Sequence, residues 1–191
     1  MKPASTTPPP RLSSSGKPAL GVLARIFGRK NRHPRKVLII GGIKSGKSFQ
    51  AEVLAESLEE RYENVLRITA ESRENEPAAS ELPSLLRKAT EPVLIDCLGV
   101  WLNRLLVELG TWQNRAGWQS HLDDCLEDLV QAWSEATVPV LAVSNETGSG
   151  MTPPTEAGRL FRDVLGALNL RISLNSDRVL FMIAGRAVTL T

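Results

Sequence analysis

The sequence predicts an α/β fold in which a mostly parallel sheet carries helices on both faces. Short apolar runs rich in valine and isoleucine alternate with segments whose apolar residues recur at helical spacing. Glycine-rich or polar residues directly follow several of the apolar runs. Strands that alternate with helices imply right-handed crossovers and a parallel sheet. Ligands of such sheets bind at the carboxyl ends of the strands, so the residues after each strand are the candidate site.

The first half of the predicted domain contains three strands and two helices. The apolar runs at 37–40, 65–69 and 93–96 are the strands, and the third of them ends in a carboxylate. Between them, residues 48–61 show the spacing of a helix, and residues 81–88 are long enough for a short second helix.

The second half continues the alternation. Helical spacing is seen over 101–109 and, more regularly, over 122–133 and 160–172. Residues 138–143 form a fourth predicted strand. Two closing strands over 179–183 and 187–190 are joined by Gly185-Arg186, which predicts a hairpin turn.

The amino-terminal residues 1–35 are predicted to be a disordered basic extension, and the folded domain is predicted to span 36–191. The extension is rich in proline and serine, a composition that cannot bury enough apolar surface to offset the entropy of ordering. A short apolar stretch at 19–27 leaves a weak membrane-surface or partner-docking helix as the alternative.

Charge is distributed unevenly along the chain. Residues 1–36 hold nine lysines and arginines and no acid, whereas the remaining residues hold 14 basic and 21 acidic side chains, a net charge of −7. A nucleic-acid-binding domain would need a basic patch on its folded part, so no nucleic-acid partner is predicted. No run reaches the roughly 18 apolar residues that a membrane span requires. Cys97 and Cys125 have no metal-ligand spacing around them, which favours reduced core thiols and a cytoplasmic protein.

A nucleotide site is predicted directly after the first strand. The segment matches G-x-x-x-x-G-K-[ST] without a mismatch, and it runs Gly41-Gly42-Ile43-Lys44-Ser45-Gly46-Lys47-Ser48. Its glycines let backbone amides curl around phosphate oxygens at the amino end of a helix. Lys47 is expected to reach the β- and γ-phosphates, and the Ser48 hydroxyl is expected to hold Mg²⁺.

Asp96 ends the third strand and is a second candidate for the same site. A carboxylate at this place typically supports Mg²⁺ directly or through water, so Ser48 and Asp96 are the predicted metal ligands. The alternative is an aspartate that caps the following helix.

Residues 144–150 follow the fourth strand and form a polar, glycine-containing loop at the same predicted edge. Asn145, Glu146, Gly148 and Gly150 are the candidate substrate-loop residues, with Glu146 able to orient a nucleophile or a second substrate. The alternative is a surface loop whose polar side chains satisfy its own backbone groups. Arg159 and Arg162, on the next predicted helix, either contact phosphate or are solvated.

Three segments together resemble the bifunctional adenosylcobinamide kinase / adenosylcobinamide-phosphate guanylyltransferase family of cobalamin biosynthesis. They are GGIKSGKS at 41–48, VLIDCLGVWLNRLL at 93–106, and VSNETGSGMTPPTEAGRLFRDVLGALN at 143–169. The last is the most specific, and the resemblance covers about residues 36–191.

The resemblance implies a RecA-like P-loop fold, often in a homo-oligomer. It implies phosphorylation of the aminopropanol hydroxyl of adenosylcobinamide by ATP or GTP, followed by transfer of GMP from GTP to that phosphate. It also implies that Thr69, Ala70 and Glu71 contact the nucleotide after the second strand. Lys47, Asp96 and Glu146 are the residues expected to carry the phosphoryl transfer.

The family's second step uses a histidine between the second and third strands. Here the interval from Glu71 to Glu91 contains no histidine, so a covalent phosphoramidate lacks its nucleophile there. The histidines of the chain are His33, in the extension, and His121, in a predicted helix. Two other interpretations remain open: a P-loop kinase of another small alcohol, and a non-catalytic paralogue that binds nucleotide.

Overall fold

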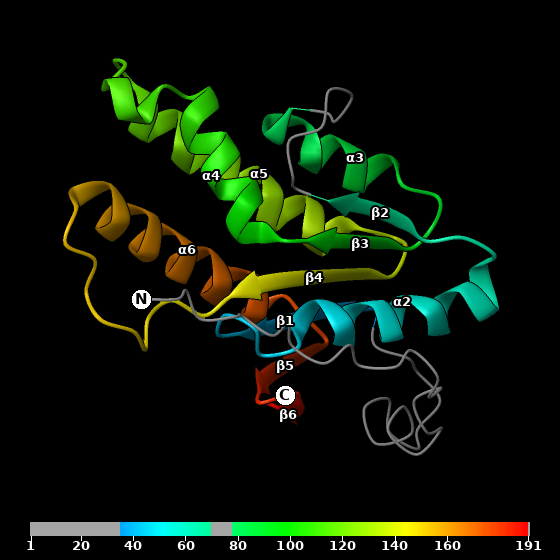
Figure 1. Ribbon diagram of the computed structural model, residues 1–191. Coiled ribbons are helices and arrows are strands. Elements are labelled where there is room, and N and C mark those ends of the chain that lie inside the picture. The colour runs from blue at the N-terminus through cyan, green and yellow to red at the C-terminus, as the bar shows by residue number, and fades with distance from the viewer. Residues whose placement is uncertain (1–34, 70–77, 191) are drawn as a thin grey trace, which may run out of the picture. The chain divides into compact units, whose positions relative to one another are not determined.

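The computed structural model describes residues 35–69 and 78–190, and the strands within them form one six-stranded sheet. Its strand order is β2-β3-β4-β1-β5-β6 (Figure 1). Neighbouring strands are parallel throughout, except that β6 runs antiparallel to β5. The predicted α/β fold with a mostly parallel sheet is thereby confirmed.

The elements follow the order predicted from the sequence. The strands are β1 Lys36–Gly41, β2 Leu66–Thr69, β3 Val93–Asp96, β4 Val140–Asn145, β5 Arg178–Ile183 and β6 Arg186–Thr189. The helices are α2 Lys47–Tyr62, α3 Leu82–Lys88, α4 Leu98–Glu108, α5 Trp118–Glu135 and α6 Glu156–Leu174, with short 3₁₀ turns η1 Ala79–Glu81 and η2 Thr111–Gln113.

One strand boundary differs in a way that affects the site. The fourth strand was expected over 138–143, but β4 extends to Asn145, because Ser144 and Asn145 pair in register with Ile40 and Gly41 of β1. Two residues of the predicted loop therefore belong to the sheet.

The apolar side chains form a core on each face of the sheet. Alternate residues of one strand point to opposite faces. Leu38, Ile95 and Ala142 belong to the cluster that packs against the helices after β2, whereas their neighbours Ile39 and Leu94 are equally buried but lie outside that cluster. Helix α2 contacts β1, β3 and β4, while α3 packs on α5 and both α4 and α5 pack on α6. The prediction of helices on both faces is confirmed.

The strand order places a topological switch point between β1 and β4. Right-handed crossovers put α2, which follows β1, on one face, and α6, which follows β4, on the other. The chain therefore diverges in opposite directions from two adjacent strand ends. Open α/β sheets bind their ligands in the crevice that this divergence creates.

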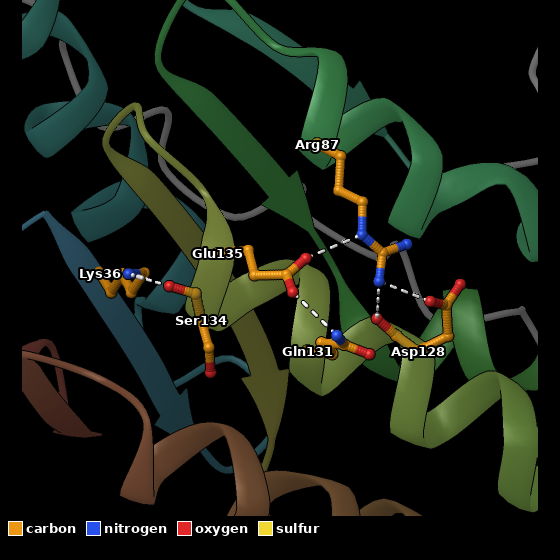
Figure 2. Close-up of polar contacts among 6 residues, drawn as sticks. All are labelled: Lys36, Arg87, Asp128, Gln131, Ser134 and Glu135. Carbon is orange, nitrogen blue, oxygen red and sulfur yellow. Dashed lines mark hydrogen bonds and ion pairs between the residues drawn. The ribbon is translucent and has the colours of Figure 1, made fainter.

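A polar cluster lies at the opposite edge of the sheet, where β1, β3 and β4 begin. The Arg87 guanidinium of α3 contacts the carboxylates of Asp128 (2.6 Å) and Glu135 (3.0 Å) of α5 (Figure 2). Hydrogen bonds from Arg87 and then Gln131 lower the pKa of Glu135. Because these groups are exposed, the contacts add little to the stability of the fold. Their main effect is to set the orientation of α3 against α5.

Four smaller expectations concern the hairpin turn, the extension, the cysteines and a membrane span. The predicted hairpin is present, but its turn is Ala184-Gly185 and not Gly185-Arg186, because Arg186 already pairs with Ile183 as the first residue of β6. Both turn residues adopt the left-handed backbone conformation. The predicted extension lies outside the described residues except for Arg35, whose amide donates to the Asp177 carboxylate (2.7 Å). Cys97 and Cys125 are free thiols and half-buried, and Cys125 packs against the core cluster. Within the described ranges no helix is long and apolar enough to cross a membrane.

Candidate functional site

The P-loop is a tight turn between β1 and α2 that two of its glycines make possible. A Cβ on Gly41 would lie 2.4 Å from the carbonyl oxygen of Met182 and 2.8 Å from Ser45 Oγ. Gly46 has a φ of +95°, in the left-handed region where a side chain is strained. The chain can therefore turn here, close to β5, only without those side chains.

The hairpin between β5 and β6 supports the P-loop. The Gly185 amide donates to the Ser45 carbonyl (3.0 Å), and the Gly185 Cα would lie 3.3 Å from a Cβ on Gly46. The turn of the hairpin is thus held against the end of the P-loop. The sequence predicted this turn but gave no signal that it contacts the loop, because the contact joins segments about 140 residues apart.

The outer side of the P-loop is open. A cavity of about 260 Å³ is lined by residues 44–49, which include the first turn of α2. Ser48 is exposed there, whereas Ser45 Oγ is buried without a hydrogen-bond partner. A cavity at the amino end of a helix favours an anionic ligand.

The Lys47 side chain lies inside this turn. It is only 7% exposed, and its Nζ donates to the Gly42 carbonyl oxygen (2.7 Å). Burial lowers the pKa of Lys47, and the nearby Cys97 and Asp96 side chains oppose that shift. The structure therefore brings the predicted lysine and the predicted aspartate close enough for their charges to interact.

Asp96 and Thr69 end neighbouring strands and are paired in register, so both reach the edge of the sheet that carries the P-loop. Asp96 is half-buried. The N-cap residue of α4 is Cys97, and no side chain makes a capping hydrogen bond there, so the helix-cap alternative for Asp96 is wrong. The other two predicted nucleotide contacts of this region, Ala70 and Glu71, lie outside the described residues.

The loop after β4 starts at the same edge, where the yellow segment leaves β4 in Figure 1. The Glu146 amide donates to the Gly41 carbonyl (2.9 Å), which ties this loop to the P-loop. The Glu146 carboxylate turns back and accepts from the amides of Gly148 (2.7 Å) and Ser149 (3.1 Å). The alternative that polar side chains of this loop satisfy its own backbone therefore describes this conformation of Glu146.

Arg159 and Arg162 of α6 donate hydrogen bonds to the end of that loop, at residues 152–154. Arg159 donates to the carbonyls of Pro153 (3.0 Å) and Pro154 (2.9 Å), and Arg162 donates to Thr152 Oγ1 (3.2 Å). The solvated alternative does not describe these contacts, and contact of the two arginines with phosphate stays a prediction. Sequence spacing could not reveal them, because the carbonyl partners of Arg159 lie in a segment without regular structure.

Acidic side chains are few around the P-loop. No group of three or more histidine, cysteine, aspartate or glutamate side chains that could hold a metal ion occurs in the part of the chain that the structure describes. His121 is exposed in the first turn of α5 and belongs to neither the P-loop nor the loop after β4.

Comparison with known proteins decides the family. A sequence model of the cobinamide kinase / cobinamide phosphate guanyltransferase family matches residues 70–190. The chain belongs to this family. The "Bifunctional adenosylcobalamin biosynthesis protein CobP" of Pseudomonas aeruginosa is 33% identical over 168 residues, which cover 78% of this chain and 92% of that protein. The "Bifunctional adenosylcobalamin biosynthesis protein CobU" of Salmonella typhimurium is 27% identical over 180 residues, covering 80% of this chain and 97% of that protein.

Membership in the cobinamide kinase / cobinamide phosphate guanyltransferase family confirms the resemblance seen in the sequence, and with it the predicted class of enzyme. The matched region begins after the P-loop, at Ala70. The match to the family model and the nucleotide motif therefore lie in separate parts of the chain, and both indicate a nucleotide-using transferase.

Proposed function

We propose that the P-loop of this chain binds a purine nucleoside triphosphate, whose γ-phosphoryl group is transferred to the aminopropanol hydroxyl of adenosylcobinamide. The observation that carries the proposal is the position of the open P-loop cavity. It follows β1 at the switch point between β1 and β4. The charge of Asp96 acts on Lys47 in its lining, and the Glu146 amide bonds the Gly41 carbonyl at the start of the P-loop. Relatives that carry out adenosylcobalamin biosynthesis give the substrate class.

The P-loop amides and Lys47 would bind the triphosphate. When the nucleotide enters, the ammonium of Lys47 exchanges the Gly42 carbonyl for β- and γ-phosphate oxygens. Gly41 to Ser48 surround the phosphates, and Thr69 with Ala70 and Glu71 contacts the nucleotide from the end of β2. Because Lys47 is buried, its charge acts on the phosphates with little screening by water.

Ser48 and Asp96 fit a magnesium ion as a sparse donor set. Mg²⁺ usually keeps several waters and takes only one or two protein oxygens in addition to substrate phosphates. Ser48 presents an exposed hydroxyl, and the charge of Asp96 acts on the neighbouring Lys47. A bound Mg²⁺ would neutralise negative charge on the β- and γ-phosphate oxygens.

The transfer needs an acceptor oxygen in line with the bond that breaks. The acceptor hydroxyl attacks the γ-phosphorus, the bond to the β-phosphate oxygen breaks, and the nucleoside diphosphate leaves. Glu146, with Asn145 beside it, would orient the hydroxyl and take its proton. The two loop amides contact Oε1, and the Ser149 amide also contacts Oε2 (3.3 Å). Each carboxylate oxygen has two acceptor sites, so Oε2 can still accept from a substrate hydroxyl.

The second step of the family, the transfer of GMP, lacks its histidine nucleophile in the interval from Glu71 to Glu91 of this chain. Without a histidine between Glu71 and Glu91, no covalent GMP–histidine intermediate forms in that interval. The residues of this chain therefore support phosphorylation of the corrinoid, and GMP transfer through the family's route is not expected.

The proposal is tested by incubating the protein with cobinamide and GTP labelled at either the α- or the γ-phosphate. We expect the γ-label on cobinamide, because the phosphate-binding loop is complete, and we expect no α-label on the denatured protein between residues 71 and 91. Mapping of labelled peptides locates any covalent adduct. A corrinoid that stays unlabelled with both GTP and ATP would contradict the proposed kinase, and a γ-label on a different small alcohol would replace its substrate.

Two further expectations, on the oligomeric state and on the location in the cell, accompany this function. The family resemblance implies a homo-oligomer, which a sedimentation measurement would detect. A cytoplasmic location is also expected, since the nucleoside triphosphates that the reaction consumes are made there and both cysteines are free thiols.

A further inference from the structure

Asn169 is a buried polar residue of α6 that the reaction scheme above does not use. It is 7% exposed and faces the end of β4. Its Oδ1 accepts a hydrogen bond from Ser144 Oγ (2.6 Å), and its Nδ2 donates to the carbonyl oxygen of Asn145 (3.0 Å). Ser144 is fully buried, so this pair of contacts is shielded from water.

The two contacts of the Asn145–Glu146 peptide group come from opposite sides. Its carbonyl accepts from Asn169 on α6, and its N–H donates to the Gly41 carbonyl at the start of the P-loop (2.9 Å). A peptide group held at both its oxygen and its nitrogen cannot rotate about its neighbouring bonds. The direction in which the Glu146 side chain leaves the backbone is therefore fixed by one residue of α6 and one of the P-loop.

The Asn145 side chain is constrained as well. A Cβ on Gly99, at the start of α4, would lie 3.1 Å from Asn145 Nδ2 and 3.6 Å from a methyl carbon of Leu165. Because Gly99 has no side chain, the Asn145 amide can lie close to the start of α4. The Asn145 side chain therefore lies against the start of α4, and the Asn145 carbonyl is bonded to α6.

We propose that Asn169 is a positioning residue for phosphoryl transfer, which acts by fixing the Asn145–Glu146 peptide group between α6 and the P-loop. This inference rests on the proposed role of Glu146. The acceptor depends on that peptide more than the triphosphate does, because the peptide meets the P-loop through the Gly41 carbonyl, whereas residues 44–49 line the P-loop cavity. Loss of the Asn169 amide therefore impairs the acceptor step selectively.

The test compares Asn169→Leu with Asn175→Ala. Asn175 is the control: it is the exposed residue that caps the carboxyl end of α6, where it accepts from Ser134 Oγ (3.0 Å) and donates to the Arg171 carbonyl (2.8 Å). Asn169→Leu is expected to lower kcat/KM for cobinamide at least about tenfold, because a small displacement of a catalytic group costs that much or more. The dissociation constant of the triphosphate should change by less than about twofold. A change of that size is within the scatter expected for sites that do not interact. Asn175→Ala should leave both quantities unchanged.

A second readout does not depend on the substrate. Hydrogen exchange of the peptide that covers residues 144–151 reports the bonded amides of Glu146, Gly148 and Ser149. We expect faster exchange there in Asn169→Leu and no change in Asn175→Ala. If the wild-type protein does not phosphorylate cobinamide, the proposed function is wrong, and this exchange measurement alone decides the inference.

Several results would overturn the positioning role. One is an Asn169→Leu protein that turns over cobinamide as fast as the Asn175→Ala protein at matched thermal stability. Another is a loss of triphosphate affinity as large as the loss for the acceptor, which would indicate general damage to the site. If Asn169→Leu does not fold, Ser144→Ala removes one of the two contacts, and unchanged exchange in residues 144–151 of that variant would also count against the proposal.

Discussion

Replacing Lys47 by methionine is expected to reduce phosphorylation of cobinamide by about two to three orders of magnitude while the protein remains folded. Removing one group that stabilises developing charge in a buried site typically costs that much. Lys47 Nζ is already within the P-loop, bonded to the Gly42 carbonyl, and is shielded from water. Methionine has a similar length and fills the same apolar path without supplying the charge.

The fold should survive because none of the ion pairs in the described part of the chain involves Lys47. The loss of its one bond to the Gly42 carbonyl costs about 1 kcal/mol. Lys88→Met is the matched control: the same substitution on an exposed lysine at the end of α3, at the edge of the sheet remote from the P-loop. A Lys47→Met protein that kept the rate of the Lys88→Met protein would show that the P-loop lysine takes no part in the transfer.

Gly41→Ala is expected to destabilise the protein strongly, whereas Gly42→Ala, one residue later, is not. A Cβ on Gly41 would lie 2.4 Å from the Met182 carbonyl oxygen, a backbone atom of β5 that cannot rotate away. A Cβ on Gly42 would meet nothing within 4 Å. Overpacking of this kind costs about 1–3 kcal/mol, and each kcal/mol lowers Tm by about 2–4 °C in a protein of this size.

The two alanine variants differ by one position in the same motif, so their thermal melting curves isolate the contact with β5. We expect Tm to fall by several degrees in Gly41→Ala and to remain within about a degree of wild type in Gly42→Ala, as for a substitution without new contacts. Equal melting temperatures for the two variants would contradict the close packing of the P-loop against β5.

Local patterns were sufficient to predict the order of the elements. The run at residues 93–96, for example, is a strand covered on both faces. Where strands alternate with helices, a short continuous apolar run is typical of such a strand. The helix spacing over 122–133 likewise falls within α5. Because these signals are repeated along a strand or helix, single-residue errors at their ends do not change the fold.

The contacts of the site could be predicted less well. The G-x-x-x-x-G-K-[ST] motif specifies a local turn, and Lys47 lies within that turn as the motif implies. The bond from Gly185 to Ser45, the contacts of Arg159 with prolines of the loop and the two bonds of Asn169 each join parts of the chain that no local pattern relates. Tertiary packing decides which hydrogen-bond donor pairs with which acceptor. The sequence shows only that such groups are present.

The central claim is that the P-loop of this chain holds a triphosphate by its backbone amides and by Lys47. Isothermal titration of the purified protein with ATP and with GTP, in the presence of Mg²⁺, tests it most directly. The account predicts saturable binding of at least one of the two nucleotides, which weakens in Lys47→Met. Absence of binding of both nucleotides to the folded wild-type protein would contradict it.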